Sequence, residues 1–201
     1  RPHFNDAMTG SVIVTPAPSP PEVSMTTPAS GSIYDGPAMV MLSADAFDDI
    51  AVTNVVFFIG TTVVGIATDI PYTLTASNVA PGNYVVMAIA TDNDGLSTTS
   101  APVSLVVRHV ISYQNYSFTP DKLTIRLGET VLFTNRGGFH TVTGSGADPF
   151  CVTDPVASCV HTFNEAGVFA VHCEFDSIMT GTIPEPPPIP PAGVVIATVA
   201  G

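Results

Sequence analysis

Residues 117–135 read SFTPDKLTIRLGETVLFTN, and this stretch decides the fold class. Apolar residues alternate with polar ones before and after Gly128 and Glu129, which is the two-residue period of a half-buried β-strand. A glycine between two such runs is typical of the turn of a β-hairpin. The stretch therefore predicts two short strands that pair with each other.

The rest of the chain repeats this pattern of short strands and turns. Its 201 residues include 16 glycines and 19 prolines, and almost no run of apolar residues has helical spacing. Hydrophobic residues make up 45% of the chain, which is enough for one large core or two small ones at about 100 to 150 residues per domain. We therefore expect an all-β protein with two domains.

The charge balance limits the partners that the chain can bind. It has 17 acidic side chains against 5 basic ones, and its net charge is -12. A phosphate backbone would be repelled, and the basic residues are too scattered to form a patch for anionic lipid. No apolar run approaches the roughly 20 residues that a membrane-spanning helix needs. We expect neither nucleic-acid binding nor membrane insertion.

The sequence divides into four segments. Residues 1–21 hold one strand and a proline-rich linker, residues 22–107 form the first domain, residues 108–183 form the second, and residues 184–201 are a proline-rich tether with a C-terminal strand. Six short strands at regular spacing predict a sandwich for the first domain: Ala38–Ala44, Thr53–Ile59, Thr62–Ala67, Tyr72–Ala76, Asn83–Thr91 and Ala101–Val107.

The first domain also carries a family resemblance. Between about residues 22 and 107 it resembles the bacterial immunoglobulin-like domains of secreted proteins, in the phrases Ala44–Asp49, Val55–Phe58, Pro71-Tyr72, Gly82–Tyr84 and Ala90–Gly95. The resemblance implies an immunoglobulin-like β-sandwich that acts as a spacer or an adhesive module. It implies no catalytic residues.

The three cysteines indicate in which redox compartment the protein resides. Cys151 and Cys159 lie eight positions apart in one loop, so we expect them to form a disulfide in an exported chain, and Cys173 then stays unpaired. The first residue is Arg1 rather than methionine, which fits a mature chain that has lost its leader. We expect a secreted protein that is extracellular, at the cell surface or in the periplasm.

Cys173 has two interpretations. It is either a buried hydrophobic residue or a metal ligand together with His140 and Met179, because a thiolate, an imidazole and a thioether are the ligands that copper prefers. From about residue 117 to 183 the chain resembles the cupredoxins of the plastocyanin and pseudoazurin type. The matching positions are Phe118–Pro120, Gly128–Val131, Asn135, His140–Val142, Phe163-Asn164, Gly167, Cys173 and Met179–Ile183.

The cupredoxin resemblance implies a Greek-key β-sandwich and a copper ion that transfers single electrons. It places the metal ligands at His140, Cys173 and Met179, with Asp176 at the position where the family has its second histidine. If Asp176 ligates, the hard anionic oxygen makes the site harder to reduce; if it does not, copper affinity falls and zinc or no metal becomes realistic.

Three functions follow from these observations. We expect a secreted cupredoxin-like copper-binding module, with a redox partner protein, displayed in a cell-surface or filamentous assembly. The first alternative is a purely structural surface subunit with a degenerate metal site, and the second is an adhesin or binding module. No Ser, His and Asp arrangement, paired catalytic carboxylates or phosphate-binding loop stands out, so we expect no enzyme.

The sequence of each tail predicts a strand that needs another strand to pair with. Ser11–Thr15 and Gly193–Ala200 are apolar runs, each separated from its domain by prolines. Such a strand can lie along the exposed edge of a neighbouring subunit's sheet, so we expect a homo-oligomer assembled through the terminal strands. The alternative is that each tail folds back and completes an edge of its own domain.

Overall fold

The computed structural model describes residues 17–120, 122–145, 150–151, 158–181 and 194–198. Every regular element in these ranges is a β-strand, so the all-β prediction is confirmed. The strands are β1 Glu22–Thr27, β2 Ser32–Asp35, β3 Ala38–Phe47, β4 Val52–Ile59, β5 Thr62–Ala67, β6 Tyr72–Val79, β7 Gly82–Asp92, β8 Ser97–Thr99, β9 Val103–Gln114, β10 Ser117–Thr119, β11 Lys122–Arg126, β12 Thr130–Asn135, β13 Thr143–Ser145, β14 Cys159–Thr162, β15 Ala170–Cys173, β16 Asp176–Gly181 and β17 Val194–Thr198.

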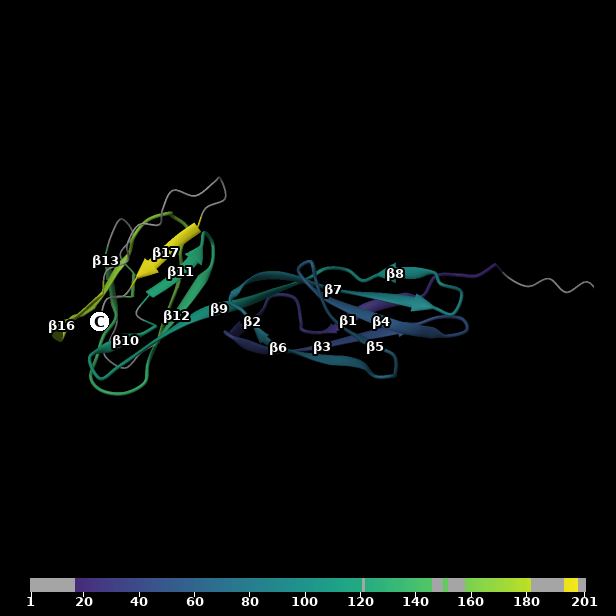
Figure 1. The fold of residues 1–201 in the computed structure, drawn as a ribbon, viewed down its shortest axis with the longest axis horizontal. Coiled ribbons are helices and arrows are strands. Elements are labelled where there is room, and N and C mark those ends of the chain that lie inside the picture. Colours follow the sequence, from purple (N-terminus) through teal and green to yellow (C-terminus); the bar gives the residue numbers. More distant parts are fainter. Residues whose placement is uncertain (1–16, 121, 146–149, 152–157, 182–193, 199–201) are drawn as a thin grey trace, which may run out of the picture.

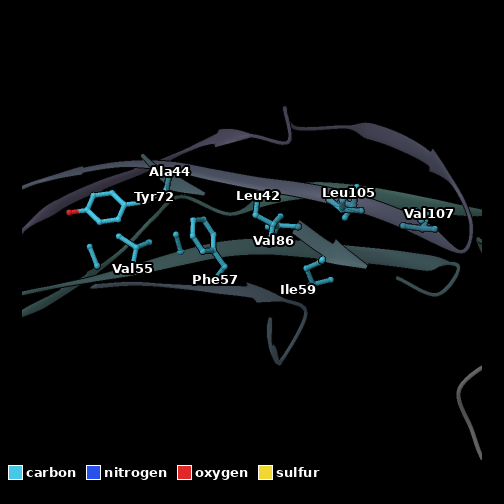
Figure 2. Packing of buried hydrophobic residues seen from close by; sticks show 14 residues of the cluster. Leu42, Ala44, Val55, Phe57, Ile59, Tyr72, Val86, Leu105 and Val107 are labelled. Carbon is cyan, nitrogen blue, oxygen red and sulfur yellow. The ribbon is translucent and has the colours of Figure 1, made fainter. Parts of the chain in front are cut away.

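The first domain is a two-layer sandwich. Strands β1, β3 and β6 form one antiparallel sheet, and β9, β7, β4 and β5 form the other, with β2 and β8 added at its sides. Side chains alternate along each strand, so every second residue of β3 and β4 points into the space between the layers. Figure 2 shows this core, in which Leu42, Phe57 and Val86 have no exposed surface.

Strand β9 belongs to both domains. Its first half pairs with β7 and β2 in the first sandwich, and its second half pairs with β12 and β10 in the second domain. The boundary that we predicted between residues 107 and 108 therefore lies in the middle of one 12-residue strand. Figure 1 shows β9 running from one domain into the other along the long axis of the molecule.

The second domain packs its core between separate small sheets. Strands β14, β12 and β9 continue the large sheet, while β13, β15 and β16 form a three-stranded sheet and β11 pairs with β17. One buried cluster joins them, with Ile111 from β9, Phe133 from β12, Val171 from β15 and Met179 from β16. No helix among the described residues is long and apolar enough to cross a membrane.

The hairpin predicted for residues 117–135 is wrong. Both strands form, but β11 pairs with β17, whereas β12 pairs with β9 on one side and β14 on the other. Because both edges of β12 are occupied, β11 has no edge of β12 to pair with. The turn at Gly128 instead carries the chain from one sheet to another, and Ile125 and Phe133 enter the same core from different layers.

The two tails differ in what the structure describes. Ser11–Thr15 lies outside the described residues. The C-terminal strand β17 is antiparallel to β11 of the same chain, with Val194 opposite Arg126 and Thr198 opposite Lys122. This is the arrangement in which a tail completes an edge of its own domain.

Candidate functional site

His140 and Cys173 meet at one end of the second domain. His140 lies in the loop after β12, and Cys173 is the last residue of β15. Nδ1 of His140 is 3.9 Å from Sγ of Cys173, and both residues are buried. The sulfur also accepts a hydrogen bond of 3.4 Å from the backbone N–H of Thr141. Cys173 is a free, buried thiol that belongs to the hydrophobic core cluster of the second domain.

Asn135 shapes the loop that carries His140. Its side-chain oxygen accepts the backbone N–H of Gly137, and its amide nitrogen donates to the carbonyl of Gly138. Gly138 has a φ of 85°, and a Cβ there would lie 2.8 Å from Nε2 of His140. A residue without a side chain is therefore needed for the loop to cover the imidazole ring so closely.

The other predicted site residues lie near this pair in the fold. Met179 is buried in the same core cluster as Cys173. Asp176 begins β16 and is opposite Cys173 in the β15–β16 register, but its side chain is outside the described part of the structure. The ring of His172 does not join them, since its Nε2 is 3.2 Å from Oε1 of the exposed Glu174.

The donors found here do not complete the copper site of the family. The described residues contain no group of three His, Cys, Asp or Glu side chains that could hold a metal ion. The position that supplies the second nitrogen in the cupredoxins is Asp176, which has no nitrogen donor in its side chain. Copper binding at His140, Cys173, Asp176 and Met179 stays a sequence-based prediction.

Burial also affects a tyrosine beside the thiol. Tyr113 in β9 is fully buried. Burial, and then the negative charge that Cys173 would carry, raises the pKa of Tyr113 above its ordinary value of 10. The phenol therefore stays protonated at neutral pH.

The structure joins Cys151 and Cys159 in a disulfide. Cys151 directly follows Phe150, whose ring is stacked on His161 with 4.3 Å between ring centroids and contacts Phe163 edge-on. Cys151 and Cys159 themselves pack against the core cluster, and Cys173 has no part in this bond.

Three exposed aromatic rings surround the mouth of the site, and the sequence analysis missed them. Tyr116, Phe139 and Phe175 are 66%, 68% and 61% exposed and come from three different loops. The ring centroids of Phe139 and Phe175 are 5.4 Å apart, and Tyr116 is edge-on to His140 at 5.2 Å. We call these three rings the aromatic tip. Their positions in the sequence could have indicated this cluster, since Phe139 directly precedes His140 and Phe175 is two residues beyond Cys173.

The aromatic tip borders a hollow of about 400 Å³. Asn115, Gly138 and His140 complete its lining beside the three rings. None of these described lining residues is a carboxylate, a lysine or an arginine. The hollow is therefore lined by aromatic rings, an amide and an imidazole, in a strongly acidic chain.

Comparison with known proteins gives a family for the first domain. Residues 21–88 match the family model described as a bacterial Ig domain. Among curated proteins, no match to the chain was found.

Several solved structures are similar to parts of the chain. Fibronectin(III)-like modules of Clostridium thermocellum CbhA are 27% identical, with a TM-score of 0.42 over 43% of this chain and 94% of that one. Bacteroides ovatus SGBP-B, solved in complex with a mixed-linkage heptasaccharide, is 12% identical with a TM-score of 0.36. The match covers 90% of this chain and 48% of that one, so the chain spans about half the length of that protein. A carbohydrate-binding module of the β-sandwich superfamily is 17% identical with a TM-score of 0.38, over 79% and 59% of the two chains.

These findings correct the predicted function. The predicted function, a copper-binding electron-transfer module, is wrong, because the family match found for the chain is to a bacterial Ig domain. The family match and the two-layer sandwich of β1 to β9 agree on the first half of the chain. Residues 21–88 thus match a bacterial Ig domain, and strands β1 to β9 form a β-sandwich of the kind that this match implies.

Proposed function

We propose that the chain is an extracellular or surface module without catalytic activity, in which the immunoglobulin-like domain is a stiff spacer that presents the second domain. The single observation that carries this proposal is strand β9, which is shared by both domains. A spacer must hold the domain that it presents at a fixed distance and in a fixed orientation. A continuous strand does so because its backbone is hydrogen-bonded on both sides of the boundary.

The pairing of β9 leaves no unpaired residue between the domains. Val107 is opposite Gly82 of β7, Arg108 is opposite Asp35 of β2, and the next residue, His109, is opposite Val131 of β12. Inter-domain linkers are usually exposed segments that few contacts cross. Here, by contrast, three consecutive residues at the domain boundary all have strand partners.

Side-chain contacts add to the stiffness at the same place. Arg108 forms an ion pair with Asp35, and its carbonyl accepts the backbone N–H of Gly36 at 2.9 Å. From the first domain, the amide of Asn83 donates to the carbonyl of Gly128 in the second domain at 3.3 Å. The two domains are thus tied by contacts outside β9 as well as by the strand.

The extracellular location is supported by the chemistry of the chain. A disulfide persists in oxidising compartments, and the chain holds one between Cys151 and Cys159. The family match of residues 21–88 to a bacterial Ig domain points the same way.

We also propose that the second domain has a cupredoxin-like fold without electron transfer. Its support is the ordered series of matching residues and the parallel pairing of β9 with β12. The close approach of His140 to Cys173 fits such a fold. In the absence of a metal role, the free thiol serves as a buried residue of the core.

Small-angle X-ray scattering tests the spacer. The wild-type chain should scatter as one extended particle, and a variant with Gly-Gly-Ser-Gly inserted between Val107 and Arg108 should show a broad distribution of domain separations. The same insertion after Gly95, in the exposed turn between β7 and β8, is the matched control and should scatter like the wild type. Far-UV circular dichroism checks that both variants stay folded. Equal flexibility of the wild type and the β9 variant would refute the spacer.

We propose, further, that copies of the chain associate by exchanging β17. The described strand partner of β11 is β17 alone, and residues 182–193, which include six prolines, could span about 40 Å if extended. The same β17 could therefore pair with β11 of a second copy in an identical register.

Deleting residues 184–201 should reduce the oligomer to a monomer in sedimentation velocity. Ile196→Pro should have the same effect, because proline removes a backbone donor from β17 but keeps the tether. Pro187→Ala, which leaves β17 intact, is the control. A particle size that neither change alters would exclude a role for this strand between subunits.

A further inference from the structure

We propose that the aromatic tip is a binding site for neutral saccharides. Loops carry binding residues on rigid scaffolds, and here three separate loops each contribute one exposed ring to the same end of the second domain. Tyr116 comes from the turn between β9 and β10, Phe139 from the loop after β12, and Phe175 from the turn between β15 and β16. Single exposed apolar residues are ordinary, but a cluster beside a hollow indicates an interaction site.

The backbone beneath Tyr116 supports a role for its ring. Gln114 and Ser117 are paired, so Asn115 and Tyr116 form a two-residue hairpin turn, and both have positive φ, at 48° and 64°. Asparagine followed by glycine is the preferred sequence for such a turn. A tyrosine at the second position is strained, and strain of this kind is kept where the side chain has a use.

The neighbouring rings hold each other in place. Phe139 and Phe175 contact at a centroid distance of 5.4 Å, and Tyr116 rests edge-on against His140, which is itself buried. A ligand that covers these rings therefore gains the burial of apolar surface while the rings lose little freedom. The aromatic tip is therefore a preorganised binding surface.

The chemistry of the hollow selects the ligand class. Its described lining carries aromatic faces, the amide of Asn115, the phenol of Tyr116 and the imidazole of His140, with no carboxylate, lysine or arginine. A charged ligand would find no counter-charge there. A pyranose ring has one apolar C–H face and a rim of hydroxyl groups, so it can cover a ring and bond to the amide and the phenol. A saccharide site at the tip does not depend on how rigidly β9 holds the domains.

Affinity gel electrophoresis of the full chain tests the site with three neutral polysaccharides, a β-1,3-1,4-glucan, a xylan and a galactomannan. At least one should retard the chain. Phe139→Ala and Phe175→Ala should each weaken binding about tenfold, as expected for aromatic residues at the centre of a binding site. Phe47→Ala, which removes a 62% exposed ring from the first domain, is the matched control and should leave retardation unchanged.

Tyr116→Gly distinguishes a direct loss of binding from a loss of binding caused by unfolding. It removes the ring but relieves the strained turn, so binding should fall while the melting temperature stays the same or rises. No retardation by any of the three polysaccharides would overturn the proposal, and so would retardation that all three tip variants leave unchanged. Retardation by anionic polygalacturonate alone would also overturn it. Concentration-dependent association that the tip variants abolish, without saccharide binding, would assign the tip to a second copy of the chain.

Discussion

Replacing Phe163 with alanine should lower the free energy of unfolding of the second domain by about 3 to 5 kcal/mol. The ring is 1% exposed, and it contacts Phe150 and Phe169 edge-on, with centroids 5.2 and 4.8 Å away. His161 also contacts it edge-on at 4.6 Å. Alanine would leave a cavity among these rings, and a close-packed core relaxes only partly around such a cavity.

Chemical denaturation followed by circular dichroism measures this loss. Phe175→Ala is the matched control, since it removes the same side chain from a 61% exposed position and should change stability by less than about 0.5 kcal/mol. Similar losses for the two variants would show that Phe163 does not lie at the centre of the second core.

Replacing Glu129 with alanine should cost about 1 to 3 kcal/mol of stability, because it removes the shared partner of two part-buried groups, the backbone N–H of Arg126 and Nε2 of His109. Oε2 of Glu129 accepts the backbone N–H of Arg126 at 2.9 Å and lies 2.9 Å from Nε2 of His109. Glu129 is 6% exposed, so water cannot replace the lost acceptor freely. The carboxylate connects the turn between β11 and β12 to strand β9.

Glu129→Gln distinguishes hydrogen bonding from charge. The amide keeps an oxygen for the N–H of Arg126, so the loss of stability should be smaller than with alanine. Glu165→Ala removes an exposed carboxylate from the same domain and should have little effect. If Glu129→Ala unfolded at the same denaturant concentration as Glu165→Ala, the contacts of Glu129 would contribute nothing to stability.

Local pattern was sufficient for most of the first domain. The alternation of apolar residues predicted β5 with its exact bounds and more than half of each of β3, β4, β6 and β7. It missed β1, β2 and β8, which are short or lie at the sides of the sheets and whose side chains alternate only between exposed and half-buried positions. The bacterial immunoglobulin-like resemblance came from residues inside this well-patterned region.

Pairing was much harder to predict than the strands themselves. The alternation in residues 117–135 is real, but alternation does not say which edge a strand will occupy. Strand β12 is taken by β9 and β14, and β14 lies beyond the disulfide loop, far along the sequence. The aromatic tip was missed for a related reason, since its three rings are dispersed in sequence and meet only in the fold.

Function was predicted from a motif rather than from a complete site. His140 and Cys173 do lie close together, yet Asp176 stands where the cupredoxins have their second histidine. Two neighbouring donors alone do not make the copper site of that family. The wrong conclusion came from giving the matching positions more weight than the one that differs.

Strand β9 also orders events during synthesis. The first sandwich lacks an inner strand until residues 103–107 have left the ribosome, so its core can close only then. The residues that follow, 109–113, then extend from a finished domain as a ready template for β12. We therefore expect the second half of the chain to assemble on a first sandwich that has already folded.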